Sequence, residues 1–193
     1  MSDDEVVRCD WASRRPGPDF DLYRDYHDRE WGRPVRDGVA LFERMSLEAF
    51  QSGLSWLIIL RKRENFRRAF CGFDVEKLAG YTDADVRRLM ADEGIVRNRA
   101  KIEATIANAR AAAELGSPED LSGMLWSFAP QPRPRPADGS QIPSATAESK
   151  AMAHELHRRG FRFVGPTTAY ALMQATGMVD DHIRACWVPT AGR

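Results

Sequence analysis

Apolar residues recur at helical spacing along the chain. Leu41, Phe42, Met45 and Ala49 fall on one face at a period near 3.6 residues, and Gly53 marks the end of this helix. No segment shows the period-two alternation that is typical of a half-buried strand, and no internal repeat is visible. The pattern therefore predicts an all-α fold.

Helix-capping residues mark the boundaries of further helices. Serine, threonine and aspartate side chains accept hydrogen bonds from free N–H groups at a helix start, and glycine favours a helix end. Thr82 and Asp85 have the three-residue spacing of a capping box. The expected helices are 19–31 (capped by Asp19 or Asp21), 82–94, 99–115, one that begins at Ser117-Pro118, and 146–159.

Prolines concentrate in one segment, which we call the Pro-rich loop. Five of the eleven prolines lie within residues 129–146. Proline has no backbone N–H and favours extended loops over helix interiors. We expect this loop to be the only boundary between lobes.

The composition is that of a soluble globular protein. The chain has 193 residues, of which 43% are hydrophobic and 29% are charged, enough for one good core or two small lobes. The acidic start at residues 1–5 does not resemble a signal peptide, and the longest apolar stretch, 54–60, is too short to span a bilayer. Three cysteines do not form a disulfide framework. We expect a cytoplasmic protein without a membrane partner.

Positive charge is locally concentrated although the net charge is zero. Eleven of the 28 basic residues lie in three clusters, at 61–68, at 97–101 with Arg97 and Lys101, and at 158–162. Each cluster taken alone is explained by a solvated helix face. Together they also fit a surface that follows a phosphate backbone, because local patches attract a polyanion even without net charge.

Four residues at the two ends of the chain are of the right types to hold a metal ion. They are Cys9, His27, His182 and Cys186. On a helix, the i,i+4 spacing of the second pair would place both side chains on one face. A set of two cysteines and two histidines with no free position is typical of a structural zinc site. The spacing of Cys9 and His27 matches no standard zinc finger, so the pattern alone is weak.

A helix-hairpin-helix pattern covers the region near residues 155–177. A basic helix ends at Gly160, a tight turn surrounds Gly165, and a helix capped by threonine follows. Glycine permits close backbone approach, and the free N–H groups of a helix start can hold a DNA phosphate. Val164, Gly165 and Thr167 are the expected contacts with DNA.

These motifs carry a resemblance to a known family. The hairpin with Val179-Asp180-Asp181-His182 resembles the helix-hairpin-helix DNA repair glycosylases. Over nearly its full length, the chain is similar to the bacterial 3-methyladenine DNA glycosylases of type I. The carrying segments are Cys9-Asp10-Trp11, 26–32, 53–56, 62–65, 94–97, 126–128 and 160–182.

The resemblance implies a fold, an activity and a partner. The fold would be the all-α helix-hairpin-helix glycosylase fold, with both termini joined by one structural Zn²⁺ held by the four metal-ligand candidates. The activity would be base excision repair by monofunctional hydrolysis of the N-glycosidic bond of 3-methyladenine. The partner would be double-stranded DNA that contains alkylated bases, bound by a monomer with the base flipped out of the helix.

The resemblance also implies a base pocket. An aromatic residue is otherwise as readily explained by core packing, and Trp31 is the one that could be mainly structural. Glu48 on its own would read as a surface or rim glutamate, but the family places it where a carboxylate binds the exocyclic amine and offsets positive charge. The expected base-binding residues are Trp11, Tyr23, Tyr26, Trp31, Glu48 and Trp56.

The catalytic assignment is divided between Glu48 and Asp180. In the wider superfamily the aspartate after the hairpin is catalytic, whereas the similar family commonly has asparagine there. Alternatively, Asp180 or Asp181 caps a helix that carries His182 and Cys186. We expect Glu48 to stabilise charge, with Asp180 as a tentative second acid.

Two features bear on DNA and on strand cleavage. Leu54 resembles the apolar wedge that fills the gap left by a flipped base, although a core leucine is an equal alternative. Thr167 occupies the position where bifunctional relatives carry a Schiff-base lysine. Without that amine, water is the nucleophile and no AP-lyase activity is expected.

The expected domain organisation is a single catalytic unit that spans residues 1–193. It would consist of a helical lobe with the hairpin, the Pro-rich loop, and a zinc-binding lobe from 1–35 and 178–193. The alternative function is a non-catalytic helix-hairpin-helix module that binds damaged DNA. A zinc hydrolase would need an open coordination position, which four protein ligands do not leave.

Overall fold

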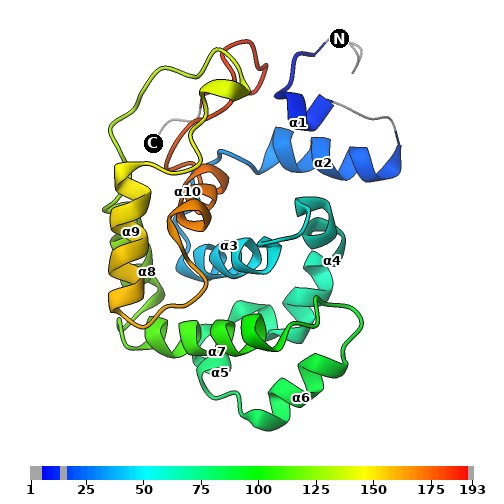
Figure 1. Ribbon diagram of the computed structural model, residues 1–193, viewed down its shortest axis with the longest axis vertical. Helices are drawn as coiled ribbons and strands as arrows, with labels where there is room; N and C mark the ends of the chain where they lie inside the picture. Colours follow the sequence, from blue (N-terminus) through cyan, green and yellow to red (C-terminus); the bar gives the residue numbers. More distant parts are fainter. Residues whose placement is uncertain (1–5, 14–16, 191–193) are drawn as a thin grey trace.

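The structure of the protein, a computed structural model, describes residues 6–13 and 17–190 (Figure 1). The acidic start at 1–5 lies outside these residues. The described chain contains helices and turns but no strand, which confirms the all-α prediction. The elements are α1 (Asp10–Ser13), α2 (Pro18–Arg29), α3 (Gly38–Gln51), α4 (Trp56–Ala69), η2 (Cys71–Phe73), α5 (Val75–Ala79), α6 (Asp83–Ala91), α7 (Arg99–Ala113), α8 (Pro118–Trp126), η3 (Gly139–Gln141), α9 (Ala147–Arg158) and α10 (Pro166–Ala175).

Local capping chemistry sets several helix starts. Capping boxes open α6 at Thr82, α8 at Ser117 and α9 at Thr146. The sequence predicts the box at Thr82, and it predicts helix starts at the other two positions. The cap of α2 is Gly17, so Asp19 and Asp21 lie in the first turn of this helix and neither caps it. A carboxylate there still interacts favourably with the positive end of the helix dipole.

Helix α3 forms the centre of the main hydrophobic core. It contacts α4, α7, α8 and α10, which surround it in Figure 1. Leu41, Phe42, Met45 and Phe50 on this helix are fully buried. The ring of Phe50 packs against that of Phe66 at a centroid distance of 4.7 Å, so it belongs to the core. Burial of this helix removes a large apolar area from water and provides a rigid support for one wall of the site.

A second, smaller hydrophobic cluster joins the two ends of the chain. The backbone N–H of Trp187 donates to the carbonyl of Val7 at 2.9 Å. The C-terminal loop consequently lies beside the segment that leads into α1 (Figure 1). The members of the cluster are Cys9, Tyr26, Trp31, Leu60, Ala175, Cys186 and Val188.

The Pro-rich loop is packed against the C-terminal segment. Arg133 and Arg135 pair with Asp181 and Asp180, and the N–H of Arg184 donates to the carbonyl of Pro136. The loop therefore covers one end of the molecule, near α10 (Figure 1). None of the helices in the described part of the chain is both long and apolar enough to cross a membrane.

Candidate functional site

A cavity of about 850 Å³ opens between the N-terminal helices, α10 and the Pro-rich loop. Its wall contains all six residues expected to bind a base, from Trp11 on α1 to Trp56 at the start of α4. Helix α2 supplies Tyr23 and Tyr26, the turn after it supplies Trp31, and α3 supplies Glu48. Its size lies within the range of small-molecule sites, about 300–1,000 Å³.

Edge-to-face and tilted ring contacts hold the aromatic part of the wall. The Trp11 ring lies 5.7 Å from that of Tyr23 and 5.2 Å from that of Trp31, between centroids. The Tyr26 and Trp56 rings are 5.3 Å apart. Each such pair contributes about 0.5–1.5 kcal/mol beyond area burial, so the rings stabilise one another's orientation.

The wall is also tied to the start of α4. The backbone N–H of Leu57 donates to the hydroxyl oxygen of Tyr23 at 3.1 Å. This N–H belongs to the first turn of the helix, where no intrahelical partner exists. Tyr23 therefore satisfies a helix end while its ring lines the cavity.

Glu48 is a buried carboxyl group in the cavity wall. Its side chain comes from α3 and the residue is 6% exposed. Burial raises the pKa of Glu48 to about 8, because desolvation penalises the charged form, and the charge of Arg44 only partly opposes this. Arg44 itself is ion-paired with Glu30. Glu48 is thus poised to lose its proton when positive charge enters the cavity.

The structure places Asp180 outside this wall. Its Oδ2 accepts a hydrogen bond from Nε of Arg135 at 2.9 Å, and its Oδ1 accepts one from the N–H of His182 at 3.3 Å. Asp180 is absent from the described residues that line the cavity. We therefore do not retain it as a catalytic acid.

The helix expected to carry His182 and Cys186 is not formed. Residues 180–190 adopt turns and irregular backbone, so the prediction of a helical i,i+4 pair was wrong. Neither Asp180 nor Asp181 caps a helix there. Instead, the bond from His182 to Asp180 closes a local aspartate turn that orients the histidine.

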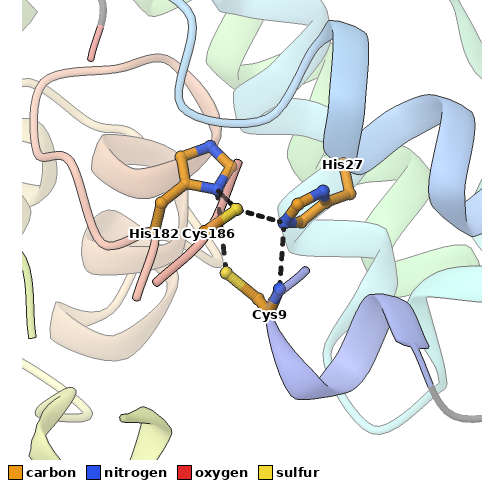
Figure 2. Close-up of side chains that lie close together, drawn as sticks. All are labelled: Cys9, His27, His182 and Cys186. Atoms are coloured by element: carbon orange, nitrogen blue, oxygen red, sulfur yellow. Dashed lines mark hydrogen bonds between the residues drawn. The ribbon is translucent and has the colours of Figure 1, made fainter. Parts of the chain in front are cut away.

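Cys9, His27, His182 and Cys186 nevertheless converge on one point (Figure 2). All four are buried, and their ligand atoms lie within 4.8 Å of one another. Nδ1 of His182 is 3.7 Å from the sulfur of Cys9 and 3.5 Å from that of Cys186, and Nε2 of His27 is 3.6 Å from the latter. Sulfur and nitrogen ligands of a tetrahedral metal are separated by about 3.5 Å. The four side chains can therefore hold a metal ion.

Groups around the cluster fix its ligands. Nδ1 of His27 lies 2.7 Å from Oδ1 of Asp28, and Nε2 of His182 lies 3.1 Å from the carbonyl oxygen of Trp31. Such contacts orient metal-binding histidines and fix their tautomer. Gly32 has φ of 76°, and a Cβ there would lie 2.9 Å from Nε2 of His182. Glycine at 32 thus permits this close approach.

The hairpin is built as expected, with one difference. Helices α9 and α10 pack together, and Asn108 holds the turn by accepting from the N–H of Arg162 at 2.7 Å and donating to its carbonyl at 3.0 Å. The cap of α10 is Gly165, not a threonine, and no side chain caps this helix. Gly165 and Thr167 are exposed, whereas the Val164 side chain is buried, which leaves only its backbone for contact.

The remaining candidates for DNA contact separate into exposed and buried residues. Leu54 is exposed in the turn between α3 and α4, and Arg97 is exposed beside Glu93. Lys101, by contrast, is buried, and its ammonium donates to the carbonyls of Phe50 and Ser52 at 2.8 and 2.6 Å. Because Lys101 satisfies the C-terminal end of α3, it is not available to a phosphate.

Part of the wall escaped the sequence analysis. Gln174 and Ala171 of α10 line the cavity, together with Asp138 and Ser140 of the Pro-rich loop. Ala171 and Gln174 are three residues apart in a helix, so the sequence could have indicated that they share one face. The contribution of the Pro-rich loop could not have been predicted, because its proline content does not indicate which part of the protein the loop packs against.

Known proteins share this sequence and fold. Residues 17–189 match the model of the methyladenine glycosylase family. The chain is 46% identical to DNA-3-methyladenine glycosylase 1 of Escherichia coli (strain K12), across 94% of this chain and 96% of that protein. It is 43% identical to the DNA-3-methyladenine glycosylase of Haemophilus influenzae, across 94% of this chain and 97% of that protein.

Solved structures agree with this similarity. A crystal structure of 3-methyladenine DNA glycosylase I superposes with a TM-score of 0.87 at 45% identity, over 94% of this chain and 98% of that one. The Staphylococcus aureus 3-methyladenine DNA glycosylase I, solved to explain 3-methyladenine recognition, superposes with a TM-score of 0.85 at 33% identity, over 96% and 97%.

Proposed function

The chain belongs to the methyladenine glycosylase family, and we propose that it removes 3-methyladenine from alkylated double-stranded DNA in base excision repair. The reaction is hydrolysis of the N-glycosidic bond. The observation that carries the proposal is the buried carboxyl group of Glu48 in the wall of an aromatic cavity. The cavity accepts a base, and a base can reach it only after it has been flipped out of the duplex.

The side chains of the wall would recognise a cationic base. The electron-rich faces of Trp11, Tyr26 and Trp56 attract a positively charged ring system that stacks on them. Glu48 can accept hydrogen bonds from the exocyclic amine once it is ionised. A positive ring beside it lowers its pKa from about 8, so binding of the base and ionisation of Glu48 favour each other.

The chemistry needs modest assistance. A 3-alkylated adenine that is attached to deoxyribose carries a positive charge and leaves as a neutral base. The enzyme therefore needs to hold the base and stabilise the charge that develops on the sugar, which a buried carboxylate can do. Water is the nucleophile.

Contacts with DNA would come from the hairpin and the turn before α4. The free N–H groups at the start of α10, near Gly165 and Thr167, suit a phosphate, and Leu54 suits the gap left by the flipped base. Arg97 adds an exposed positive charge. An enzyme that scans chromosomal DNA in this way is expected to act as a monomer in the cytoplasm.

The metal of the four-ligand cluster would be Zn²⁺ with a structural role. Two thiols and two imidazoles form a closed set that zinc prefers, and no open position remains for a substrate. When bound, zinc supplies a rigid tetrahedral link between the chain ends. The protein residues of that link also support Trp31 in the cavity wall.

We further propose that the enzyme does not cleave the DNA strand. A lyase needs an amine that attacks C1′ of the sugar, and no lysine is found among the described residues that line the cavity. Thr167 occupies the corresponding position in the hairpin. The abasic product is consequently expected to keep an intact backbone.

The test is release of free 3-methyladenine from methylated duplex DNA, measured by chromatography of the liberated bases. We expect release by the wild-type protein, and a rate lowered by about 100-fold or more in Glu48→Gln. Glu114→Gln, at the exposed C-cap of α7, is the matched control. Tight binding of damaged DNA without any base release would instead support the non-catalytic module and overturn the enzymatic proposal.

A further inference from the structure

The amide of Gln174 is held in one orientation at the cavity wall. Gln174 and Ala171 lie one turn apart on α10, and both line the cavity. Nε2 of Gln174 donates a hydrogen bond to Oδ2 of Asp181 at 2.9 Å. Because an ionised carboxylate only accepts hydrogen bonds, the amide nitrogen faces Asp181, and the carbonyl oxygen Oε1 is left for the cavity.

Asp181 is itself held from three sides. It is 1% exposed, and its Oδ1 accepts from Nη2 of Arg133 at 2.8 Å. Its Oδ2 accepts from the hydroxyl of Tyr170 at 2.5 Å in addition to Gln174. These partners come from the Pro-rich loop and from α10, so the carboxylate cannot turn toward the cavity. It can act on the cavity only through the amide of Gln174.

No carboxylate in the described part of the wall is better placed to hold a water molecule. Asp180 is bound to Arg135 and lies outside the wall. Asp10 and Asp138 line the cavity but are exposed, and Oδ1 of Asp138 accepts from the N–H of Ser140 at 2.8 Å. Glu48 is the group that the proposed function assigns to the base. Of the two amides in the described wall, Gln51 bonds only to a backbone carbonyl at 3.4 Å, whereas Gln174 is held at 2.9 Å by a buried carboxylate, so its carbonyl is the better fixed acceptor for the nucleophile.

We propose that Gln174 is a catalytic residue that holds the attacking water through Oε1, and that Asp181 is the positioning residue that fixes the amide. This inference rests on the proposed glycosylase function. Water forms the new bond from its oxygen to C1′. The bond from C1′ to N9 breaks, its electron pair neutralises the cationic base, and the proton of the added water passes to solvent.

An amide is sufficient for this step because of the charge of the leaving group. When the cationic base departs, the sugar carries positive charge, and the water that adds to it becomes strongly acidic. No strong base is needed to remove its proton. What the enzyme must provide is orientation of the water, and a preorganised acceptor provides it without reorganisation.

The first test compares Gln174→Met with Gln131→Met, which makes the same change at an exposed position of the Pro-rich loop. We measure the single-turnover rate of 3-methyladenine release from methylated duplex DNA, and inhibition of wild type and variants by free 3-methyladenine. Loss of one neutral hydrogen bond predicts a rate about tenfold lower in Gln174→Met, with unchanged affinity for the free base. Gln131→Met should keep the wild-type rate.

The second test uses Gln174→Glu. A protonated carboxyl group can donate to Asp181 and present its carbonyl to the cavity, whereas an ionised one is repelled by Asp181. The ratio of variant to wild-type rate should therefore rise toward one as the pH falls. Because both proteins contain Glu48, the effect of its titration cancels in this ratio. A third variant, Asp181→Asn, should lose about as much of the rate as Gln174→Met. Its metal content is first verified to equal that of wild type.

Three results would overturn the proposal: an unchanged single-turnover rate in Gln174→Met, an equal loss of rate and of affinity for the free base, or a pH-independent ratio in Gln174→Glu. The second would mean that the amide binds the base rather than water. If Gln174→Met does not fold, the pH ratio decides alone, because it compares Gln174→Glu with wild type and does not need Gln174→Met. A wild-type protein that releases no 3-methyladenine is a separate outcome that defeats the proposed function.

Discussion

Nε2 of His182 lies 3.1 Å from the backbone carbonyl oxygen of Trp31, so a metal-ligand candidate contacts directly a residue of the cavity wall. The two rings also meet edge to face at 4.7 Å between centroids. His182 belongs to the C-terminal loop, whereas Trp31 follows α2 near the N-terminus. Any change that releases the histidine therefore releases the wall as well.

Removal of one metal ligand should destabilise both the fold and the cavity. We expect Cys186→Ser to lose the metal, to reduce the free energy of unfolding by an amount on the order of several kcal/mol, and to lose base-release activity. Metal analysis and thermal unfolding check this. Cys71→Ser is the control, because Cys71 is exposed and lies outside the cluster. Equal metal content and stability in the two variants would contradict a metal-binding role.

Asp28 should tune metal affinity without entering the cluster. Its Oδ1 lies 2.7 Å from Nδ1 of His27, and Arg8 binds the same carboxylate at 2.9 Å. We expect Asp28→Asn to weaken metal binding by about 10- to 100-fold, because loss of the negative charge makes the imidazole a poorer ligand. Competition with a chelator measures this. Asp25→Asn, at an exposed position one turn earlier on α2, should leave the affinity unchanged.

The buried carboxyl group of Glu48 should make stability depend on pH. Its pKa is about 8 in the folded protein and near 4.5 when unfolded, so between these values the folded state binds more protons. Stability attributable to this group is fully present below about pH 4.5 and is lost as the pH rises through about 8, by an amount on the order of a few kcal/mol.

Chemical unfolding at several pH values tests this dependence. In Glu48→Gln the fall in the free energy of unfolding between pH 5 and 9 should be smaller than in wild type by that amount, since the amide does not titrate. Glu114→Gln, at an exposed site, should retain the wild-type slope. Parallel pH curves for Glu48→Gln and wild type would show that Glu48 titrates normally.

What the sequence could predict was local. The capping boxes at Thr82, Ser117 and Thr146 depend on residues three positions apart, so the helix starts followed directly. The spacing of His182 and Cys186 was less informative, because a four-residue interval also fits a turn. That turn is closed locally by the bond from His182 to Asp180, and it is held by the N–H of Ile183, which donates to the sulfur of Cys9 at the other end of the chain, a contact that no local pattern contains.

The part of the cavity wall that residues 11–56 supply was predicted, whereas the part from α10 and the Pro-rich loop was not. The resemblance to a family supplied Trp11, Glu48 and Trp56, because these residue types have a recognisable chemistry. Gln174 was missed because a glutamine becomes distinctive only when a buried carboxylate such as Asp181 fixes its amide. Whether a basic side chain is buried or exposed likewise depends on the tertiary structure.

Lys101 is buried and Arg97 is exposed, so removal of each side chain should affect the stability of the protein differently. Lys101→Met leaves the carbonyls of Phe50 and Ser52 without a charged donor, so we expect stability to fall by about 2 kcal/mol. Arg97→Ala removes an exposed charge whose contact with Glu93 is long, at 3.7 Å, so stability should change by less than about 0.5 kcal/mol.

DNA binding measured at several salt concentrations completes this comparison. If Arg97 contacts a phosphate, Arg97→Ala should weaken binding to all sequences and reduce the slope of log affinity against log salt by about one. Lys101→Met, assayed well below its melting temperature, should keep the wild-type slope because its ammonium is already bound to backbone carbonyls. A reduced slope in Lys101→Met would mean that this side chain leaves the end of α3 when DNA binds, and the buried position would then be only the DNA-free arrangement.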